Sequence, residues 1–260
     1  MIHNPVVDTM LARKSIRKYT TEQPSDEVIE TIVRVGQQAP FAYQMGSLIL
    51  SRDMKSNPFS APLLFTICVD VHRFELIMKQ RGWTTTSNDL FTMVLGIQDA
   101  ALMAENMVIA AESLGLGSCF LGGWPFAAKS LQKKHNIPQR VFPLVGLTMG
   151  YPAENPPVRP RYPLDYHLFQ NEYPEFDEET IQKAMRVMDE GYLAQDYYHN
   201  ANYMIPLKGK REESFTFDNY SWTEHISRKL GLWLHSPRSI LAAFKTCGFK
   251  LPGMRTGKSD

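Results

Sequence analysis

DLFTMVLGIQDAALMAENMVIAAESL, residues 89–114, is the longest stretch of helical periodicity in this chain. Apolar side chains recur in it at intervals of three and four residues, at Leu90, Met93, Val94, Ile97, Ala101, Ala104, Val108 and Ala111. Its alanines allow close packing on more than one side, so we predict a central helix. Gly115 and Gly117 should end it, because glycine adopts the left-handed conformation without a Cβ penalty.

Strands and helices alternate on both sides of this helix. Short apolar runs bounded by glycine, proline or polar residues predict strands at residues 47–51, 63–71, 118–124 and 143–149. Helical spacing predicts helices at residues 6–14, 26–38, 129–135, 177–190, 222–230 and 236–248. Ser25 should cap the second of these helices. Prolines keep residues 150–163 extended. The alternation predicts an α/β or α+β protein.

The composition argues against nucleic-acid and membrane partners. The chain has 260 residues with 28 Lys and Arg against 27 Asp and Glu, which leaves no basic surplus for a nucleic-acid track. It has no signal-peptide pattern and no stretch near the ~18 apolar residues that cross a bilayer, so we predict a cytoplasmic protein. Cys68, Cys119 and Cys247 are widely spaced and odd in number, which predicts buried thiols rather than disulfides or a cysteine metal site.

Three separate segments have unusual local chemistry. Residues 13–18, RKSIRK, place four cations and a hydroxyl side by side, and such donors attract a compact anion. Gly122-Gly123 ends a predicted strand, and Arg159-Pro160-Arg161 projects two guanidiniums from a proline-restricted loop. Each segment also has a simpler interpretation: a solvated basic surface, a turn and an ordinary loop. On spacing alone, these simpler interpretations are favoured.

Six segments in order resemble the nitroreductase superfamily, in particular its oxygen-insensitive NADPH nitroreductase and flavin reductase P branch. They are RKSIRKYT at 13–20, QAPFAYQ at 38–44, AAESLGLG at 110–117, FLGG at 120–123, GYPAENP at 150–156 and RPR at 159–161. The resemblance covers residues 5–162, and SWTEHI at 221–226 extends it into the last third of the chain.

The resemblance implies an α+β fold with a central, mostly antiparallel sheet flanked by helices and a C-terminal helical extension that wraps a dimer partner. Residues 1–163 would form the FMN-binding core, and residues 164–260 the extension of the same domain. FMN would lie without covalent attachment at the interface of a homodimer. NAD(P)H would be the co-substrate, and nitroaromatics, quinones or flavins would be the small-molecule acceptors of a ping-pong oxidoreductase.

The resemblance also assigns three groups of cofactor contacts. Cations and a hydroxyl would hold the phosphate end of FMN: Arg13, Lys14, Ser15, Arg17, Arg159 and Arg161. A loop of the other subunit would approach the flavin through Ala39, Pro40, Phe41 and Gln44. A strand end would run along the ring edge, where a backbone N–H reaches N5: Leu121, Gly122 and Gly123. Hydride chemistry at N5 needs no catalytic side chain, and the seven histidines show no metal spacing or triad.

Three departures from the branch leave alternatives open. Phe41 stands where the branch has small hydroxyl residues, and the short connection 53–62 lacks a Gly-Gly-Gln segment. Residues 217–220, FDNY, replace an arginine that helps select NADPH; Lys208, Lys210 and Arg211 would supply that contact or form a solvated loop. One alternative function is therefore an FMN-binding protein with little NAD(P)H turnover, and another is a specialised reductase of the same superfamily. The acceptor and the nicotinamide preference stay open.

Overall fold

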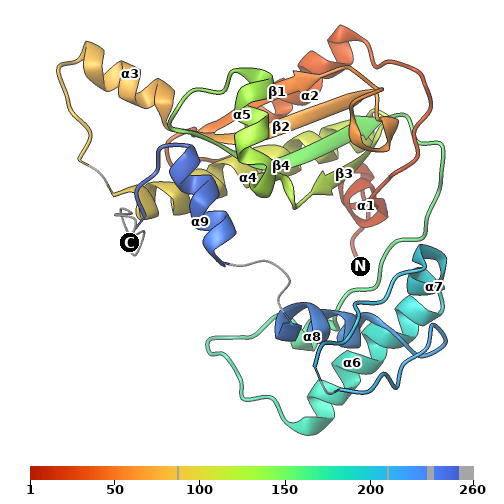
Figure 1. Ribbon diagram of the computed structural model, residues 1–260. Coiled ribbons are helices and arrows are strands. Elements are labelled where there is room, and N and C mark those ends of the chain that lie inside the picture. Colours follow the sequence, from red (N-terminus) through yellow and green to blue (C-terminus); the bar gives the residue numbers. More distant parts are fainter. Residues whose placement is uncertain (87, 210, 233–236, 252–260) are drawn as a thin grey trace. The chain divides into compact units, whose positions relative to one another are not determined.

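The computed structural model describes residues 1–86, 88–209, 211–232 and 237–251. The chain divides into two compact units, and Figure 1 shows the elements of both. The first unit comprises Met1–Pro156 together with Pro237–Asp260, and the second comprises Pro157–Ser236. The last helix therefore belongs to the first unit, whereas the sequence assigned residues 164–260 to a single extension.

A four-stranded antiparallel sheet forms the centre of the first unit. Its strand order is β1-β2-β4-β3, so β1 and β3 lie at opposite edges. The strands are β1 Gly46–Ser51, β2 Leu63–Asp70, β3 Gly117–Leu121 and β4 Val141–Gly150. Seven of the eight residues of β2 are buried, as expected for a strand covered on both faces.

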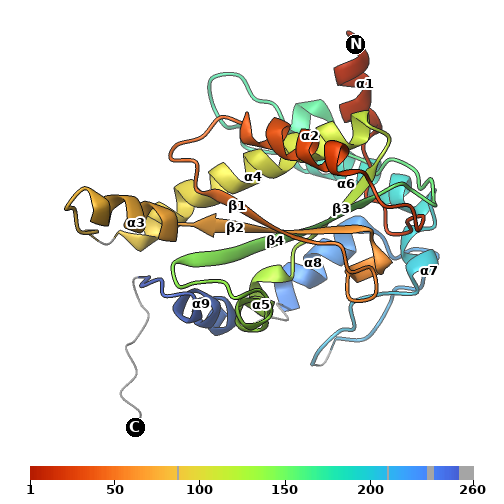
Figure 2. The same ribbon diagram turned by 90° about the horizontal axis from the view of Figure 1, so that it is seen from above.

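Helices cover both faces of this sheet (Figure 2). α2 (Asp26–Gln37) and α4 (Asp89–Ser113) lie on one face, and α5 (Ala128–His135) and α9 (Pro237–Thr246) lie on the other. α1 (Pro5–Ala12) packs against α4, and α3 (His72–Gln80) follows β2. Two short 3-10 helices complete the unit, η1 (Pro58–Ser60) and η2 (Trp124–Ala127).

α4 is the central helix that the sequence predicts. Its small residues let it approach the sheet closely: a Cβ on Gly96 would lie 2.3 Å from a methyl carbon of Val69. Among the described residues it is the one helix long and apolar enough to span a membrane, so the expectation that no stretch comes near that composition is wrong. Half of its most apolar window is buried in the protein, as in the core helix of a sheet.

The other predicted elements are confirmed with small shifts at their ends. Ser25 caps α2 by accepting a hydrogen bond from the Val28 N–H, and Gly115 takes the left-handed conformation after α4 with φ of +80°. Gly117 does not act as a cap, because it begins β3. Among the described residues, the sequence analysis missed two α-helices, α3 and the five-residue α7 (Tyr197–Ala201). The predicted start of the last helix, Ser236, lies outside the described residues, as do His235 and Lys210.

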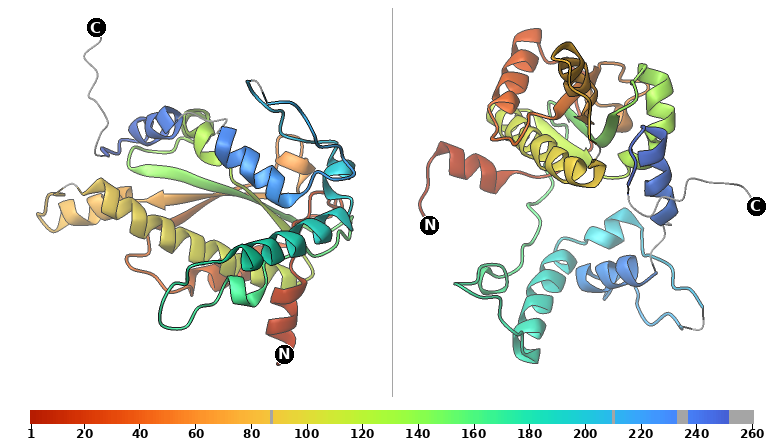
Figure 3. Two further views of the ribbon diagram at one scale, coloured as in Figure 1. Left: turned by 90° about the horizontal axis from the view of Figure 1, so that it is seen from below. Right: turned by 90° about the vertical axis from the view of Figure 1, so that its left-hand side faces the viewer.

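The second unit is helical, with α6 (Glu178–Leu193), α7 (Tyr197–Ala201), α8 (Trp222–Leu232) and the 3-10 helix η3 (Leu164–Tyr166). α6 and α8 pack side by side (Figure 3). Its described core is small and aromatic, formed by Met188, Tyr192, Tyr198 and Tyr220. Residues 151–163 contain no regular helix or strand, as the prolines predict.

Candidate functional site

The basic segment, residues 13–18, is fastened to the edge of the sheet at β3. Ser15 forms an isolated parallel bridge with Ser118, and the Ile16 N–H donates to the Ser118 carbonyl at 2.8 Å. Ile16 is only 2% exposed and packs on Gly117, where a Cβ would lie 2.4 Å from its Cγ1. The alternation of buried and accessible residues therefore buries Ile16 and leaves the flanking polar side chains accessible.

The segment after β4 fixes the basic segment from its other side. The Glu154 carboxylate accepts the N–H groups of Arg17 and Lys18 at 2.5 and 3.1 Å, and the Lys14 ammonium donates to Asn155 Oδ1. The Lys14 ammonium thus already uses one of its hydrogen-bond donors. Neither Arg13 nor Arg17 forms an ion pair with a described carboxylate. Two guanidiniums therefore remain available on a backbone that is held in place.

Burial shifts two acidic groups near these guanidiniums, Glu112 and Cys119, towards their neutral forms. Burial raises the pKa of Glu112 to about 7, against the opposing effect of Arg13 and Lys14, and Glu112 Oε1 is buried without a hydrogen-bond partner among the described residues. Burial also raises the pKa of the Cys119 thiol, although Arg17 lowers it. These two groups therefore offset less of the positive charge than ionised groups would, which favours anion binding, while the Glu154 carboxylate is bound to the backbone N–H groups of Arg17 and Lys18.

The predicted strand-end turn follows on the same strand. Leu121 ends β3, and Gly122 and Gly123 are exposed glycines with no positive φ. A Cβ on either would meet no atom within 4 Å, so the packing of this chain does not require glycine there. No hydrogen bond from either N–H to another described residue is present. The turn thus offers free backbone donors and open space.

A buried carboxylate shapes the loop at residues 39–45. Asp99 of α4 is 4% exposed and accepts the N–H groups of Ala42, Tyr43 and Met45 at 2.6, 3.0 and 3.0 Å. Three such bonds satisfy the carboxylate and fix the loop that follows α2. The sequence analysis missed Asp99, although an acid between the apolar residues Ile97 and Ala101 of α4 is a signal that could have found it.

Arg73 completes the same loop and borders a cleft. Its guanidinium donates to the carbonyls of Gln44 and Gly46, the second at 2.8 Å, and Gln44 has a left-handed φ of +57°. The cleft has a volume of about 330 Å³. Its lining includes all four loop residues that the sequence predicted as flavin contacts, Ala39, Pro40, Phe41 and Gln44. Phe41 is 56% exposed, whereas Ala39 is buried.

The structure brings only some of the predicted residues together. Ser15 and Gly122 meet the same strand, β3, at one edge of the sheet, whereas the loop at residues 39–45 precedes β1 at the other edge. Three strand spacings separate β1 from β3, about 14 Å. Within one chain the loop and the strand-end turn therefore do not line a common pocket.

Comparison with known protein families shows to which family this chain belongs. The family model described as Nitroreductase family matches residues 10–51 and 54–151. The chain belongs to the nitroreductase family. The match includes the basic segment, the 39–45 loop and the Gly122-Gly123 turn, so the predicted family is confirmed and this nitroreductase is an oxidoreductase.

Individual relatives match over most of the chain. The oxygen-insensitive NADPH nitroreductase of Salmonella typhimurium is 28% identical over 241 residues, covering 87% of this chain and 91% of the relative. The FMN reductase (NADPH) of Bacillus subtilis is 28% identical over 256 residues, covering 92% and 95%. The structure of the NADPH:FMN oxidoreductase from Vibrio harveyi complexed with NAD+ has a TM-score of 0.73 at 25% identity, covering 95% of this chain and 99% of that one. The predicted α+β nitroreductase-like fold is confirmed.

The two remaining predicted arginines lie in the second unit of this nitroreductase. Arg159 donates to Gln195 Oε1 at 2.6 Å and lies over the Tyr197 ring at 4.2 Å. Arg161 is exposed and donates to the carbonyls of Arg159 and Pro160. Their participation in a phosphate site with Arg13 and Arg17 stays a prediction. No group of metal-ligating side chains occurs in the part of the chain that the structure describes.

Proposed function

We propose that this nitroreductase is a homodimeric, FMN-dependent NAD(P)H oxidoreductase that reduces nitroaromatics, quinones or flavins by a ping-pong mechanism. The observation that carries the proposal is the arrangement along β3. The guanidiniums of Arg13 and Arg17, which form no ion pair with a described carboxylate, flank Ser15; Ser15 pairs with Ser118, and the open turn at Gly122-Gly123 lies four residues further along. Four residues of strand span about 13 Å, of the order that a ribityl phosphate bridges.

The residues present fit FMN at both ends. Arg13, Ser15 and Arg17, with Lys14 beside them, would hold the phosphate through charge-assisted hydrogen bonds, and Arg159 and Arg161 would add to them. Leu121, Gly122 and Gly123 would face the ring edge with their backbone. When bound, FMN supplies the hydride chemistry, accepting a hydride from NAD(P)H and passing two electrons to the acceptor. The chain's own task is to hold, orient and expose that ring.

Two features support the homodimer. The cleft lined by Ala39, Pro40, Phe41 and Gln44 lies at the β1 edge, so these residues would complete a site at the β3 edge only from a second copy. The outer face of α4 is also apolar: the side chains exposed along it include Leu90, Phe91, Val94, Ile97 and Leu102. Such a patch marks an interaction surface. An obligate pair would bury more than about 2,000 Å².

The names of the relatives support the choice of substrates. NADPH, FMN and nitro compounds stand in the names of proteins that this chain resembles over most of its length. Ping-pong turnover needs one open face that NAD(P)H and the acceptor use in turn. Phe41, exposed on the cleft, would border that face and limit the acceptor to flat molecules that tolerate an aromatic contact.

The first experiment tests cofactor and reaction together. The purified protein should bind FMN, and anaerobic mixing with NADH or NADPH should bleach the oxidised flavin spectrum. If the purified protein carries no flavin after incubation with FMN, the proposal is wrong. A flavin spectrum that persists with both nucleotides would instead favour an FMN-binding protein without turnover.

The phosphate assignment has its own test. Arg17→Ala combined with Arg161→Ala should weaken FMN retention, because each charge-assisted hydrogen bond is worth about 1.5–3 kcal/mol, or roughly a tenfold to hundredfold change in Kd per arginine. Arg34→Ala is the matched control, since Arg34 is an exposed arginine paired with Glu30 on α2. Unchanged FMN occupancy in the double variant, measured by equilibrium dialysis, would refute the assignment.

A further inference from the structure

Trp124 follows the glycine turn and folds back over the sheet. Leu121, Gly146 and Thr66 are direct partners across β3, β4 and β2, so they form a row perpendicular to the strands. A Cβ on Gly146 would lie 2.8 Å from the Trp124 ring and 3.0 Å from Leu121 Cδ1. The indole ring therefore covers the one residue of the row that has no side chain.

A hydrogen bond fixes the orientation of this ring. The Trp124 indole N–H donates to Thr66 Oγ1 at 3.1 Å, and Thr66 is 1% exposed on a central strand. Trp124 also borders a small buried cluster that includes Leu131 and Val141. Packing alone would account for an aromatic residue at position 124, but it would not require an indole N–H. The Trp124 N–H is needed because the buried Thr66 hydroxyl must have a hydrogen-bond partner on its side of the sheet.

These contacts hold the glycine turn from both ends. Leu121 is held in the β3–β4 ladder, and Trp124 is held over β4 and β2, so only Gly122 and Gly123 lie between two anchored residues. Glycine has more conformational freedom than any other residue, and no other described group hydrogen-bonds to these two N–H groups. The direction in which the two peptide groups point is therefore set by their anchors.

We propose that Trp124 is a positioning residue for the flavin reaction: its bond to Thr66 and its packing on Gly146 aim the Gly122 and Gly123 peptides at the ring edge of FMN. The inference rests on the proposed function. It separates two properties of the site. Phosphate binding depends on the basic segment near Ser118, whereas the environment of the reacting ring depends on the Trp124 anchor.

Two conservative variants test the inference in the FMN-loaded protein. Trp124→Phe keeps an aromatic ring over Gly146 but removes the donor, and Thr66→Val keeps the shape of the side chain but removes the acceptor. Both should shift the midpoint potential and absorption band of bound FMN, and should slow flavin reduction by NAD(P)H about tenfold or more with little change in KM. Because the two variants break one bond, the double variant should be no worse than the more affected single variant.

The controls distinguish positioning from loss of structure. FMN affinity should stay within about threefold of wild type in both variants, since a tenfold change would mean a loss of about 1.4 kcal/mol at the phosphate end. Trp222→Phe is the matched control, because Trp222 donates to the Tyr162 hydroxyl in the second unit; its potential and rate should equal those of wild type. Wild-type potential and rate in Trp124→Phe and Thr66→Val would overturn the inference alone. A wild-type protein that binds no FMN would overturn the proposed function, and this inference with it.

Discussion

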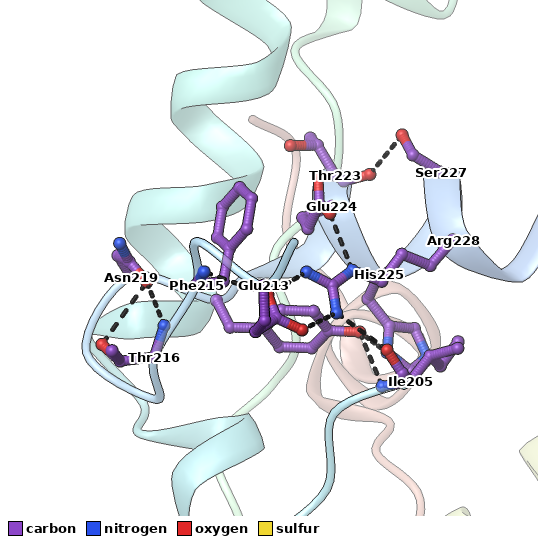
Figure 4. Close-up of polar contacts among 11 residues, drawn as sticks. Ile205, Glu213, Phe215, Thr216, Asn219, Thr223, Glu224, His225, Ser227 and Arg228 are labelled. Carbon is purple, nitrogen blue, oxygen red and sulfur yellow. Dashed lines mark hydrogen bonds and ion pairs between the residues drawn. The ribbon is translucent and has the colours of Figure 1, made fainter. Parts of the chain in front are cut away.

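Two arginines, the half-buried Arg140 in the first unit and the buried Arg228 in the second, form the same kinds of contact in different surroundings. Arg140 in the first unit binds Asp89, Glu75 and the Gly248 carbonyl, and its guanidinium lies 4.5 Å from the centre of the Phe249 ring. Arg228 in the second unit binds two glutamates and the Ile205 carbonyl, and lies over two aromatic rings, as Figure 4 shows for its polar contacts. Each joins segments distant in the sequence.

The two clusters differ in which partner is buried. In the first, the Asp89 side chain is 3% exposed and Arg140 is 14% exposed. In the second, Arg228 is 2% exposed, while Glu213 and Glu224 are 39% and 28% exposed. Removing one member of a buried pair is costly because it leaves the other charge without a partner or water. The first unit should therefore be sensitive to loss of the arginine, and the second to loss of a carboxylate.

The clusters also differ in what surrounds them. Arg140 stands beside a sheet with a large apolar core, and it ties that core to the C-terminal segment through Gly248 and through Lys250, whose N–H also binds Asp89. The described core of the second unit is one methionine and three tyrosines. There the Arg228 bonds hold the two ends of the segment from Ile205 to Glu213. Polar bonds thus replace apolar packing where little core is available.

The largest expected effect comes from Arg140→Met. The buried Asp89 carboxylate would lose its two hydrogen bonds from the guanidinium, so we expect the free energy of unfolding to fall by about 3–5 kcal/mol in a denaturant titration. Adding Asp89→Leu should recover part of the loss, because the buried carboxylate is then removed as well. Arg34→Met, which breaks an exposed pair with Glu30, should cost less than about 1 kcal/mol. An Arg140→Met loss as small as that of the control would contradict the comparison.

Glu213→Gln should have a smaller and local effect. Among the described residues, it leaves Glu224 as the remaining charged partner of the buried Arg228 guanidinium, and it loosens one end of the segment from Ile205 to Glu213. Trypsin should then cleave after Lys208 and Arg211 faster than in wild type, while the first unit stays intact. Arg140→Met is the control in the first unit: it should leave the rates of cleavage after Lys208 and Arg211 unchanged under native conditions. Equal rates in wild type and Glu213→Gln would show that the bond does not hold the segment.

Acid should produce the smallest effect, again in the second unit. The hydrogen bond from Arg228 lowers the pKa of Glu213 from 4.5 to about 2. A carboxyl with a lowered folded-state pKa stabilises the fold above its unfolded pKa, and this stability is lost as the pH falls. The segment should therefore open between pH about 4.5 and about 2, followed by pepsin cleavage within residues 205–213. The Glu213→Gln protein should not show this pH-dependent opening. An identical pH profile of cleavage in wild type and Glu213→Gln would show that protonation of Glu213 does not cause it.

Local sequence accounts for much of the fold and for part of the site. α2 and α4 have strong periodicity and side-chain caps at Ser25 and Asn88, so their positions could be predicted closely. α3 has no side-chain cap, and none of its residues is buried. The basic segment and the glycine turn were visible as motifs. Asp99, Arg73 and Trp124 were not, because their partners lie 27 to 58 residues away in the sequence.

The sequence by itself determined the family, the order of the strands and of most helices, and the residues proposed to hold FMN. Those conclusions depend on periodicity, capping and ordered motifs, all of which are local. Only the tertiary structure decided which charges are compensated. Arg13 and Arg140 are both arginines, yet Arg13 has no ion pair with a described carboxylate and Arg140 has two, because Asp89 and Glu75 reach Arg140 across 51 and 65 residues of chain. Burial and pairing depend on distances that only the folded chain creates.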